Sequence, residues 1–270
     1  LYPDPEEFSV GRESSREEKR TQVETALNGN PVIVVADDDL DGYGCATLLA
    51  AFHGPEDVGV IHAGHSDPPG VEAVLTMLGE AVGPNQEQIY ICDLPPNEES
   101  AYVDAVKQLQ KTAFVTVYDH HNWSDGVRSQ IGYQGEIVIG SGISGTEVTH
   151  KELSEDWNKA SSWNRFVTLV TDHDLGSKKI DRSETLADSA DQLSAETFRR
   201  KALEQKEQLV EDATVAEIVE EYRTTKQEQI RLAKQRAQVD DSGDVTVITT
   251  YGRCPSSQTA HHLFEAFDGE

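Results

Sequence analysis

Five short apolar runs, each about the length of a β-strand, are the feature that most constrains the fold of this chain. They lie at residues 31–36, 58–62, 88–92, 114–118 and 136–140. Continuous rather than alternating apolar runs are typical of strands buried on both faces. Segments of helical character separate them, and an alternation of strand and helix favours a mainly parallel sheet flanked by helices. We therefore predict an α/β fold.

The expected organisation has three parts. The strands and their connecting helices predict a first domain over residues 1–182. A polar, helical segment over 183–240 predicts a linker, with one long helix from Val215 to Ala237. The turn Asp240–Gly243, a strand at 245–249 and a helix at 257–267 predict the start of a second α/β domain over 241–270, which these 270 residues contain only in part. The helices expected within the first domain cover 14–27, 43–52, a segment from 71, 98–111, 146–153 and 157–171.

Three of the predicted strands end in acidic residues. Asp37, Asp39 and Asp41 follow the first strand, Asp93 follows the third, and Asp119 follows the fourth. In parallel sheets ligands bind outside the carboxyl ends of the strands. These carboxylates are therefore expected to meet at one edge of the sheet.

Carboxylates that converge without cations repel one another and are costly to bury. A divalent cation removes that cost, and oxygen ligands with one imidazole suit manganese or magnesium better than zinc or copper. His120 and His121 follow Asp119 directly, so one ring can bind metal while the other faces substrate. The competing interpretations are an acidic surface loop at 37–41, a turn residue at Asp93 and a surface histidine pair.

The charge balance limits the partners. The formal net charge is −26, from 49 acidic and 23 basic residues. This excess is typical of proteins from salt-rich cells, where self-repulsion is screened, although an ordinary acidic protein remains an alternative. No basic stretch predicts a long nucleic-acid footprint. The three cysteines are too scattered for a disulfide framework or a zinc site, and there is no signal peptide or membrane span, so we expect a cytoplasmic protein.

Four segments in order resemble the motifs of the DHH phosphoesterase superfamily, in particular its RecJ-like exonucleases. VVADDDLDG resembles the first motif, ICDLP the second, VYDHHNW the third and TDHD the fourth, and the likeness spans about residues 31–176. Within TDHD, Asp172 is the expected counterpart, with Asp174 as the alternative. Many members carry a histidine near the start of the first motif, where this chain has Val34-Val35-Ala36, so the RecJ-like Asp37 is expected to supply the missing ligand or lie behind the metals.

The resemblance implies a role for each matched residue. Asp39 and Asp41 would each bind one of two Mn²⁺ ions (Mg²⁺ being possible), and Asp93 would bridge the ions. His120 and Asp172 would complete the site. His121 would contact the phosphate, and Asp119 would orient His120. Chemistry would then proceed by attack of a metal-activated water.

The substrate is the least constrained prediction. The turn from Gly140 to Thr146 opens a helix, so its amides, with Ser144 and Thr146, are expected to contact a substrate phosphate, or else form a plain capped loop. Arg253, in the tail, is a further expected contact. The leading function is hydrolysis of single-stranded nucleic acid or short oligonucleotides. The alternatives are hydrolysis of small phosphates (cyclic dinucleotides, adenosine bisphosphate, pyrophosphate or polyphosphate) and a non-catalytic partner of replication or repair proteins.

Overall fold

The computed structural model describes residues 16–64, 69–132, 135–241 and 246–250, together with Ala260 and Leu263. It divides into two compact units, one ending at Val215 and the other beginning at Ala216. Each unit is described by itself. None of the described helices combines the length and the apolar character needed to cross a membrane.

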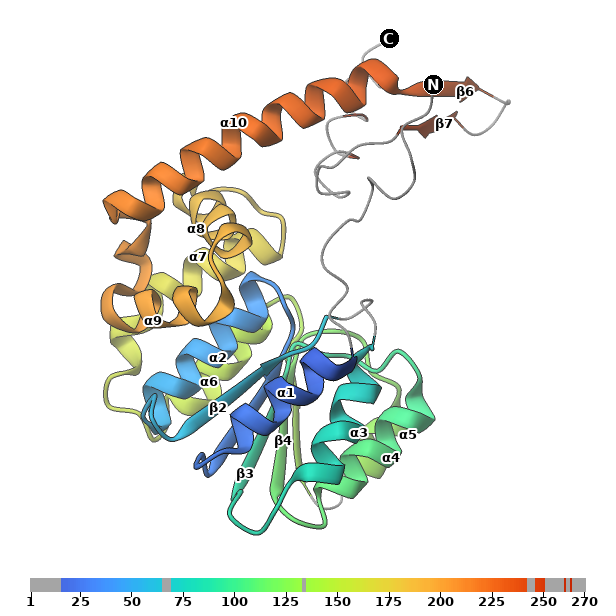
Figure 1. Cartoon of the computed structure of the whole chain (residues 1–270), viewed down its shortest axis with the longest axis vertical. Helices are drawn as coiled ribbons and strands as arrows, with labels where there is room; N and C mark the ends of the chain where they lie inside the picture. The colour runs from blue at the N-terminus through green and yellow to red at the C-terminus, as the bar shows by residue number, and fades with distance from the viewer. Residues whose placement is uncertain are drawn as a thin grey trace. The chain divides into compact units, whose positions relative to one another are not determined.

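A five-stranded parallel sheet forms the centre of the first unit (Figure 1). The strand order is β2-β1-β3-β4-β5, and every neighbouring pair is parallel. The strands are β1 (Val32–Ala36), β2 (Val58–His62), β3 (Gln88–Cys92), β4 (Phe114–Asp119) and β5 (Gly135–Ile139). The predicted α/β fold with a parallel sheet is confirmed, and each strand lies within one residue of its expected position.

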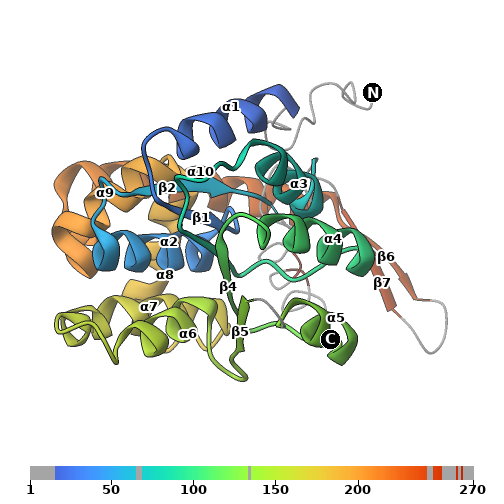
Figure 2. The same ribbon diagram turned by 90° about the horizontal axis from the view of Figure 1, so that it is seen from below.

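Helices cover both faces of this sheet (Figure 2). On one face lie α1 (Arg16–Leu27), α3 (Val71–Ala81), α4 (Glu99–Leu109) and α5 (Asp125–Ile131). Their apolar residues form one continuous buried core with those of β1 to β4. Ile33 and Val35 of β1 belong to this core, and helices on the opposite face cover the strand from the other side, so its sequence VIVVA is buried at all five positions.

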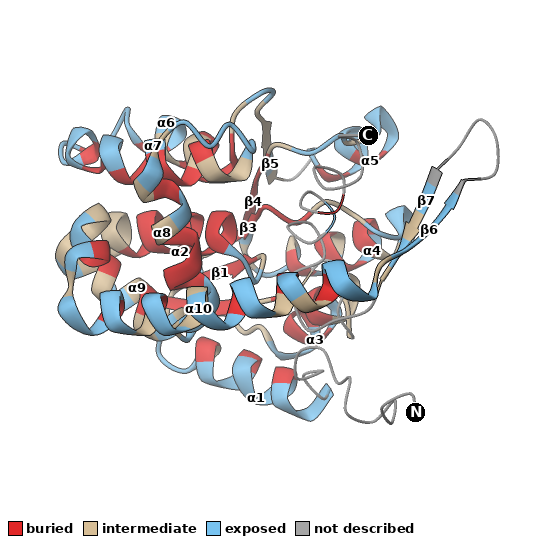
Figure 3. Ribbon diagram, turned by 90° about the horizontal axis from the view of Figure 1, so that it is seen from above, coloured by how far each residue is buried: buried red, intermediate tan, exposed pale blue. Residues whose placement is uncertain are grey.

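The other face is covered by α2 (Leu40–His53) and α6 (Gly145–Leu153). Helix α2 is buried from Leu40 to Ala50 because further helices pack onto it (Figure 3). These are α7 (Asn164–Asp174), α8 (Asp181–Gln192) and α9 (Ala195–Gln205); a short 3-10 segment at Ala160–Trp163 precedes α7, and another at Lys206–Glu211 follows α9. Helices α8 and α9 therefore belong to the first unit, whereas the sequence pattern predicts a linker over 183–240.

The register brings acidic residues together at the carboxyl edge. Ala36 pairs with Cys92, and Cys92 pairs with Tyr118. The next residues, Asp37, Asp93 and Asp119, therefore lie side by side, and the N–H groups of Asp37 and Asp93 donate to the carbonyls of Cys92 and Tyr118 at 3.3 and 2.9 Å. In this strand order, β2 lies on one side of β1, while β3, β4 and β5 lie on the other side. Ligands of such sheets bind at the point between β1 and β3 where the strand order changes direction.

The remaining differences from the sequence predictions are local. Helix α5 is not among the predicted helices, and the segment expected as one helix at 157–171 is divided into a 3-10 turn and α7. Helix α5 begins at a residue that favours a helix start, since the Ser124 hydroxyl caps it by accepting a hydrogen bond from the N–H of Val127.

The second unit contains most of α10 (Ala213–Arg236) and the antiparallel pair β6 (Gln238–Asp241) and β7 (Thr246–Thr249). The long helix and β7 both agree with the sequence prediction. Strand β6 includes Asp240 and Asp241, where the sequence predicts a turn. Arg253 and most of the predicted helix at 257–267 lie outside the described residues.

Candidate metal centre

Asp93 occupies the centre of the acidic edge. It follows β3 in a left-handed backbone conformation (φ 58°), which an aspartate adopts more readily than most residues. Its side chain is buried, and its Oδ1 atom has no hydrogen-bond partner among the described residues. A buried carboxylate oxygen without a donor is costly unless another positive group reaches it.

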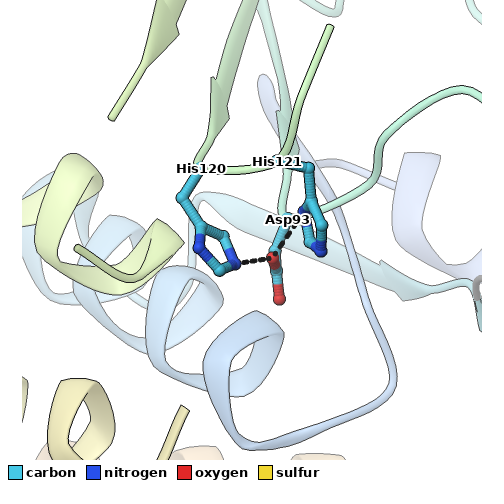
Figure 4. A group of neighbouring side chains, drawn as sticks. All are labelled: Asp93, His120 and His121. Atoms are coloured by element: carbon cyan, nitrogen blue, oxygen red, sulfur yellow. Dashed lines mark ion pairs between the residues drawn. The ribbon is translucent and has the colours of Figure 1, made fainter. Parts of the chain in front are cut away.

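The rings of His120 and His121 lie on either side of the Asp93 carboxylate (Figure 4). His120 Nε2 is 3.2 Å from Asp93 Oδ1, and His121 Nδ1 is 3.6 Å from the same atom. His120 Nε2 also lies 3.8 Å from Asp41 Oδ2 and 3.7 Å from Asp174 Oδ2. Three carboxylates from different elements therefore converge on one imidazole nitrogen.

The ligand atoms form three groups that could each hold a metal ion, and the third of these consists of Asp93, His120 and His121 (Figure 4). Asp37, Asp39 and Asp93 make up the first group, and Asp41, His120 and Asp174 make up the second; within each group the ligand atoms lie within 4.8 Å of one another. Asp93 and His120 therefore connect all three groups of candidate ligands.

The electrostatics of the cluster call for a cation. Loss of hydration, together with the charge of Asp41, raises the pKa of Asp174 to about 7. The pKa of Asp39 is also raised to about 7, although this residue keeps an exposed surface. The main cause is loss of hydration by surrounding protein atoms, and the charges of Asp37 and Asp41 add to it. Burial and the neighbouring aspartates raise the pKa of Asp93 well above its usual range. Full ionisation of the cluster at neutral pH is therefore unfavourable without added positive charge.

The state of His120 suits a metal ligand. Burial lowers the pKa of the His120 ring, so the ring is neutral at pH 7. Its Nε2 atom faces the carboxylates of Asp41, Asp93 and Asp174. In the tautomer that carries its proton on Nδ1, the lone pair of Nε2 is available to bind a cation.

Backbone amides of α6 hold Asp41 in place. Its Oδ2 accepts a hydrogen bond from the N–H of Gly145 at 2.6 Å, and its Oδ1 accepts one from the N–H of Thr146 at 2.9 Å. The Thr146 hydroxyl donates to the Asp41 carbonyl at 2.8 Å. A carboxylate at a helix N-terminus is stabilised by the helix dipole. These hydrogen bonds fix the position of Asp41, and its Oδ2 still faces His120.

Asp119 contacts a different histidine ring from the one we expected. Its Oδ1 accepts hydrogen bonds from the backbone N–H groups of His120 and His121, at 2.6 and 2.8 Å, and lies 2.8 Å from His121 Nδ1. Asp119 is fully buried, and its carboxylate therefore orients the ring of His121 rather than that of His120. This hydrogen bond raises the pKa of His121, whose side chain is 43% exposed.

Asp172 does not join the cluster. Its carboxylate accepts hydrogen bonds from the Ser183 hydroxyl at 2.6 Å and from the N–H groups of Lys179 and Ile180 at 3.1 Å each. Although burial acts in the opposite direction, these donors hold the pKa of Asp172 below its usual range. Asp174 instead reaches His120, and its Oδ2 is buried without a hydrogen-bond partner among the described residues. Of the two aspartates in TDHD, the structure thus brings Asp174 rather than Asp172 to the cluster.

The expected substrate contacts at Ser144 and Thr146 are engaged inside the protein. Both residues are fully buried. The Ser144 hydroxyl caps α6 by accepting a hydrogen bond from the N–H of Glu147 at 3.1 Å, and it also contacts the Thr171 hydroxyl at 2.9 Å. The α6 amides that were expected to bind a phosphate are occupied by Asp41. Of the two interpretations of this turn, the capped loop is the one observed. The third expected contact, Arg253, lies outside the described residues.

Comparisons with known proteins give relatives by structure. No family model and no curated protein matches the sequence. Exonuclease RecJ bound to manganese aligns over 92% of this chain and 77% of its own, with 15% identity and a TM-score of 0.56. The DHH domain of a protein described as a member of a ribosomal-protein family aligns over 93% and 72%, with 13% identity and a TM-score of 0.58.

An uncharacterized protein from Helicobacter pylori G27 aligns over 88% of this chain and 80% of its own, with 14% identity and a TM-score of 0.54. At this level of identity the likeness concerns the fold. The chain therefore has the fold of RecJ and of the DHH domain, which agrees with the family resemblance of its four motifs.

Proposed function

We propose that the chain is a divalent-metal-dependent phosphoesterase that hydrolyses phosphodiester bonds beside a pair of Mn²⁺ or Mg²⁺ ions. The observation that carries this proposal is the buried Asp93 carboxylate, which joins two groups of candidate metal ligands and has an oxygen without a hydrogen-bond partner among the described residues. A non-catalytic scaffold has no use for so costly an arrangement.

The donor set fits the proposed ions. Asp37, Asp39 and Asp93 would hold one ion, while Asp41, His120 and Asp174 would hold the other, with Asp93 shared. Carboxylate oxygens with a single imidazole suit Mn²⁺ and Mg²⁺. When bound, a pair of such ions lowers the pKa of a water molecule to near neutrality and offsets the negative charge that develops on the phosphoryl oxygens.

The His121 ring is a protein group that can carry positive charge beside the cluster. His121 is exposed beside the cluster, and its hydrogen bond to Asp119 leaves the opposite nitrogen, Nε2, free of that contact. Because Asp119 raises the pKa of His121, the ring carries positive charge to a higher pH than an ordinary histidine. We infer that its Nε2–H donates to a non-bridging oxygen of the scissile phosphate.

Single-stranded nucleic acid or a short oligonucleotide is the substrate class we propose. It is supported by the fold shared with an exonuclease, by the acidic DxDxDG form of the first motif, and by an exposed histidine at the site. The overall negative charge indicates that binding depends on the metal centre and a few local groups rather than on a long basic surface.

The test combines metal binding with hydrolysis. The chelator-treated protein is titrated with Mn²⁺, followed by electron paramagnetic resonance, and is then incubated with a 5′-labelled single-stranded oligonucleotide. We expect two bound ions and metal-dependent shortening of the strand. Asp93→Asn should lose both, whereas Asp104→Asn, an exposed aspartate of α4, should retain both. Wild-type protein that binds no Mn²⁺, or an Asp93→Asn variant with unchanged turnover, would refute the proposal.

A further inference from the structure

A cavity separate from the candidate metal centre lies beside the outer edge of the sheet, in the first unit. Its volume is about 530 Å³, and it is lined by α1, by strand β2 and by the start of α9. Strand β2 is an edge strand, so one side of its backbone has no neighbouring strand among the described residues. A cavity of this size accommodates a nucleotide-sized ligand.

The cavity adjoins the candidate metal centre through one short loop. Asp38 lines the cavity, while its neighbours Asp37 and Asp39 belong to the first group of candidate ligands. The Asp38 carboxylate accepts a hydrogen bond from the Tyr43 hydroxyl at 2.7 Å. His62, also in the cavity wall, lies 3.0 Å through Nδ1 from the carbonyl of Asp37. The loop of the first motif is thus a shared wall between the two sites.

Two cationic side chains line this cavity in a strongly acidic protein. Lys19 is almost fully buried, and its Nζ donates to the carbonyl of His62 at 2.5 Å, at the end of the edge strand. Arg199 projects from α9 and has no hydrogen bond or ion pair with any described residue. Partial burial lowers the pKa of its guanidinium, while the charge of Glu196, one turn earlier, acts in the opposite direction. A half-buried arginine without an ion pair is well placed to bind an anion.

The strand edge adds backbone donors. The N–H of Val32 in β1 donates to the carbonyl of Asp57, and the N–H of Ala63 donates to the carbonyl of Ala36 in β1. The backbone groups of odd-numbered residues in β2 therefore face β1. Val58, Val60 and His62 therefore direct their backbone groups outwards, as the contact of His62 O with Lys19 shows. An anionic ligand in the cavity would meet the guanidinium, the ammonium and the outward N–H of Val60.

We propose that this cavity binds a nucleoside phosphate unit of the substrate, with Arg199 and Lys19 contacting its phosphate. This inference rests on the proposed function, because it assigns the cavity to a nucleotide that neighbours the scissile bond. The same phosphate and nucleoside chemistry is also found in a free nucleotide, and the experiment separates the two sources.

The first arm measures binding without metal or turnover. Calorimetric titration with adenosine 5′-monophosphate in chelator buffer should detect one site in the wild-type protein. Arg199→Gln should weaken that affinity at least tenfold, while Arg199→Lys should restore part of it. Arg200→Gln is the matched control, because Arg200 is exposed on the same helix and should leave binding unchanged. Equal affinities for wild type and Arg199→Gln, in proteins with matching thermal unfolding, would overturn the site.

The second arm measures hydrolysis of a short oligonucleotide with Mn²⁺. Arg199→Gln should raise KM about tenfold with little change in kcat, because a positioning contact is lost. An unchanged KM alongside weakened monophosphate binding would overturn the assignment to substrate and identify the occupant as a free nucleotide. Absence of all hydrolysis by the wild-type protein would count against the proposed function itself, while the metal-free titration would still decide whether the cavity binds a nucleoside phosphate.

Discussion

Asp172 and Asp174 lie two residues apart in the last turn of α7, and their carboxylates serve different structures. Asp172 accepts hydrogen bonds from Lys179, Ile180 and Ser183, which joins α7 to the start of α8. Asp174 Oδ2 reaches Nε2 of His120 at 3.7 Å. Two residues correspond to a rotation of about 200° around a helix, so the two side chains leave opposite sides of it.

This division gives a prediction with a built-in comparison. Asp174→Asn should lower Mn²⁺ affinity with little loss of stability. Loss of a residue that only orients a metal ligand lowers affinity by roughly 10- to 100-fold, and we expect a larger loss here because Asp174 would bind the ion directly. Asp172→Asn should instead lower the free energy of unfolding by about 1–3 kcal/mol, because it replaces an acceptor for three donors, and should retain Mn²⁺ binding. Urea unfolding and Mn²⁺ titration of both variants check this. The reverse pattern would return the ligand role to Asp172.

Much of the fold was predictable because the apolar runs are short and continuous. The five strands, the parallel sheet and the meeting of Asp37, Asp93 and Asp119 at one edge all follow from strand–helix alternation. Which side chain of a motif faces the centre does not follow, because it depends on helix phase and on tertiary partners. Asp172 and Asp174 look alike in TDHD until the donors at 179–183 are brought to α7.

The same limit explains the turn before α6. The sequence identifies a glycine-rich loop that opens a helix, and the amides of such a loop can bind any carboxylate or phosphate. Asp41, more than a hundred residues earlier, is the group that occupies them. The contact of Asp119 with His121 rather than His120 is likewise a matter of ring geometry that adjacent sequence positions leave open.

The histidine pair should separate metal binding from catalysis. His120→Ala should lose Mn²⁺ binding at the second group, because it removes the imidazole ligand of that group. His121→Ala should retain Mn²⁺ binding and lower kcat by about 100-fold, as expected when a charge-stabilising donor is removed. Asp119→Asn should resemble His121→Ala, since it acts through that ring. Loss of Mn²⁺ in the His121 variant would assign this ring to the metal instead.

Mn²⁺ affinity should rise with pH through neutrality. Asp39 and Asp174 have pKa values of about 7, and both must be deprotonated to bind metal. Below pH 7 protons compete with the metal, so affinity should fall by up to about tenfold per pH unit for each proton released. Calorimetry at pH 6, 7 and 8 in buffers of different ionisation enthalpy would count the protons. An affinity independent of pH across this range would contradict the protonated state of the free cluster.

The contribution of Asp39 and Asp174 to the stability of the metal-free protein should fall as the pH rises. The pKa of Asp39 and that of Asp174 are raised above the unfolded value near 4, so the folded state binds more protons between about pH 4 and 7. Their contribution is fully present below pH 4 and is lost as the pH rises through 7. Saturating Mn²⁺ should offset this loss, by about 2.7 kcal/mol at a concentration 100 times Kd. Thermal unfolding with and without Mn²⁺ at pH 5.5 and 8 should show the larger gain at pH 8.

The absence of a side chain at Gly44 should be needed for α2 and α6 to pack closely enough to position Asp41. A Cβ atom at this position of α2 would lie 2.2 Å from Oγ1 and 3.0 Å from Cγ2 of Thr146, so Gly44→Ala forces α2 and α6 apart. Since Thr146 also binds Asp41, the variant should lose about 1–3 kcal/mol of stability by overpacking and bind Mn²⁺ more weakly. Gly126→Ala in α5 is the control, because a Cβ there meets only Ser124 Oγ at 3.8 Å. It should be neutral or stabilising by up to about 1 kcal/mol. Equal unfolding curves and Mn²⁺ affinities for the two variants would show that the α2–α6 contact does not position Asp41.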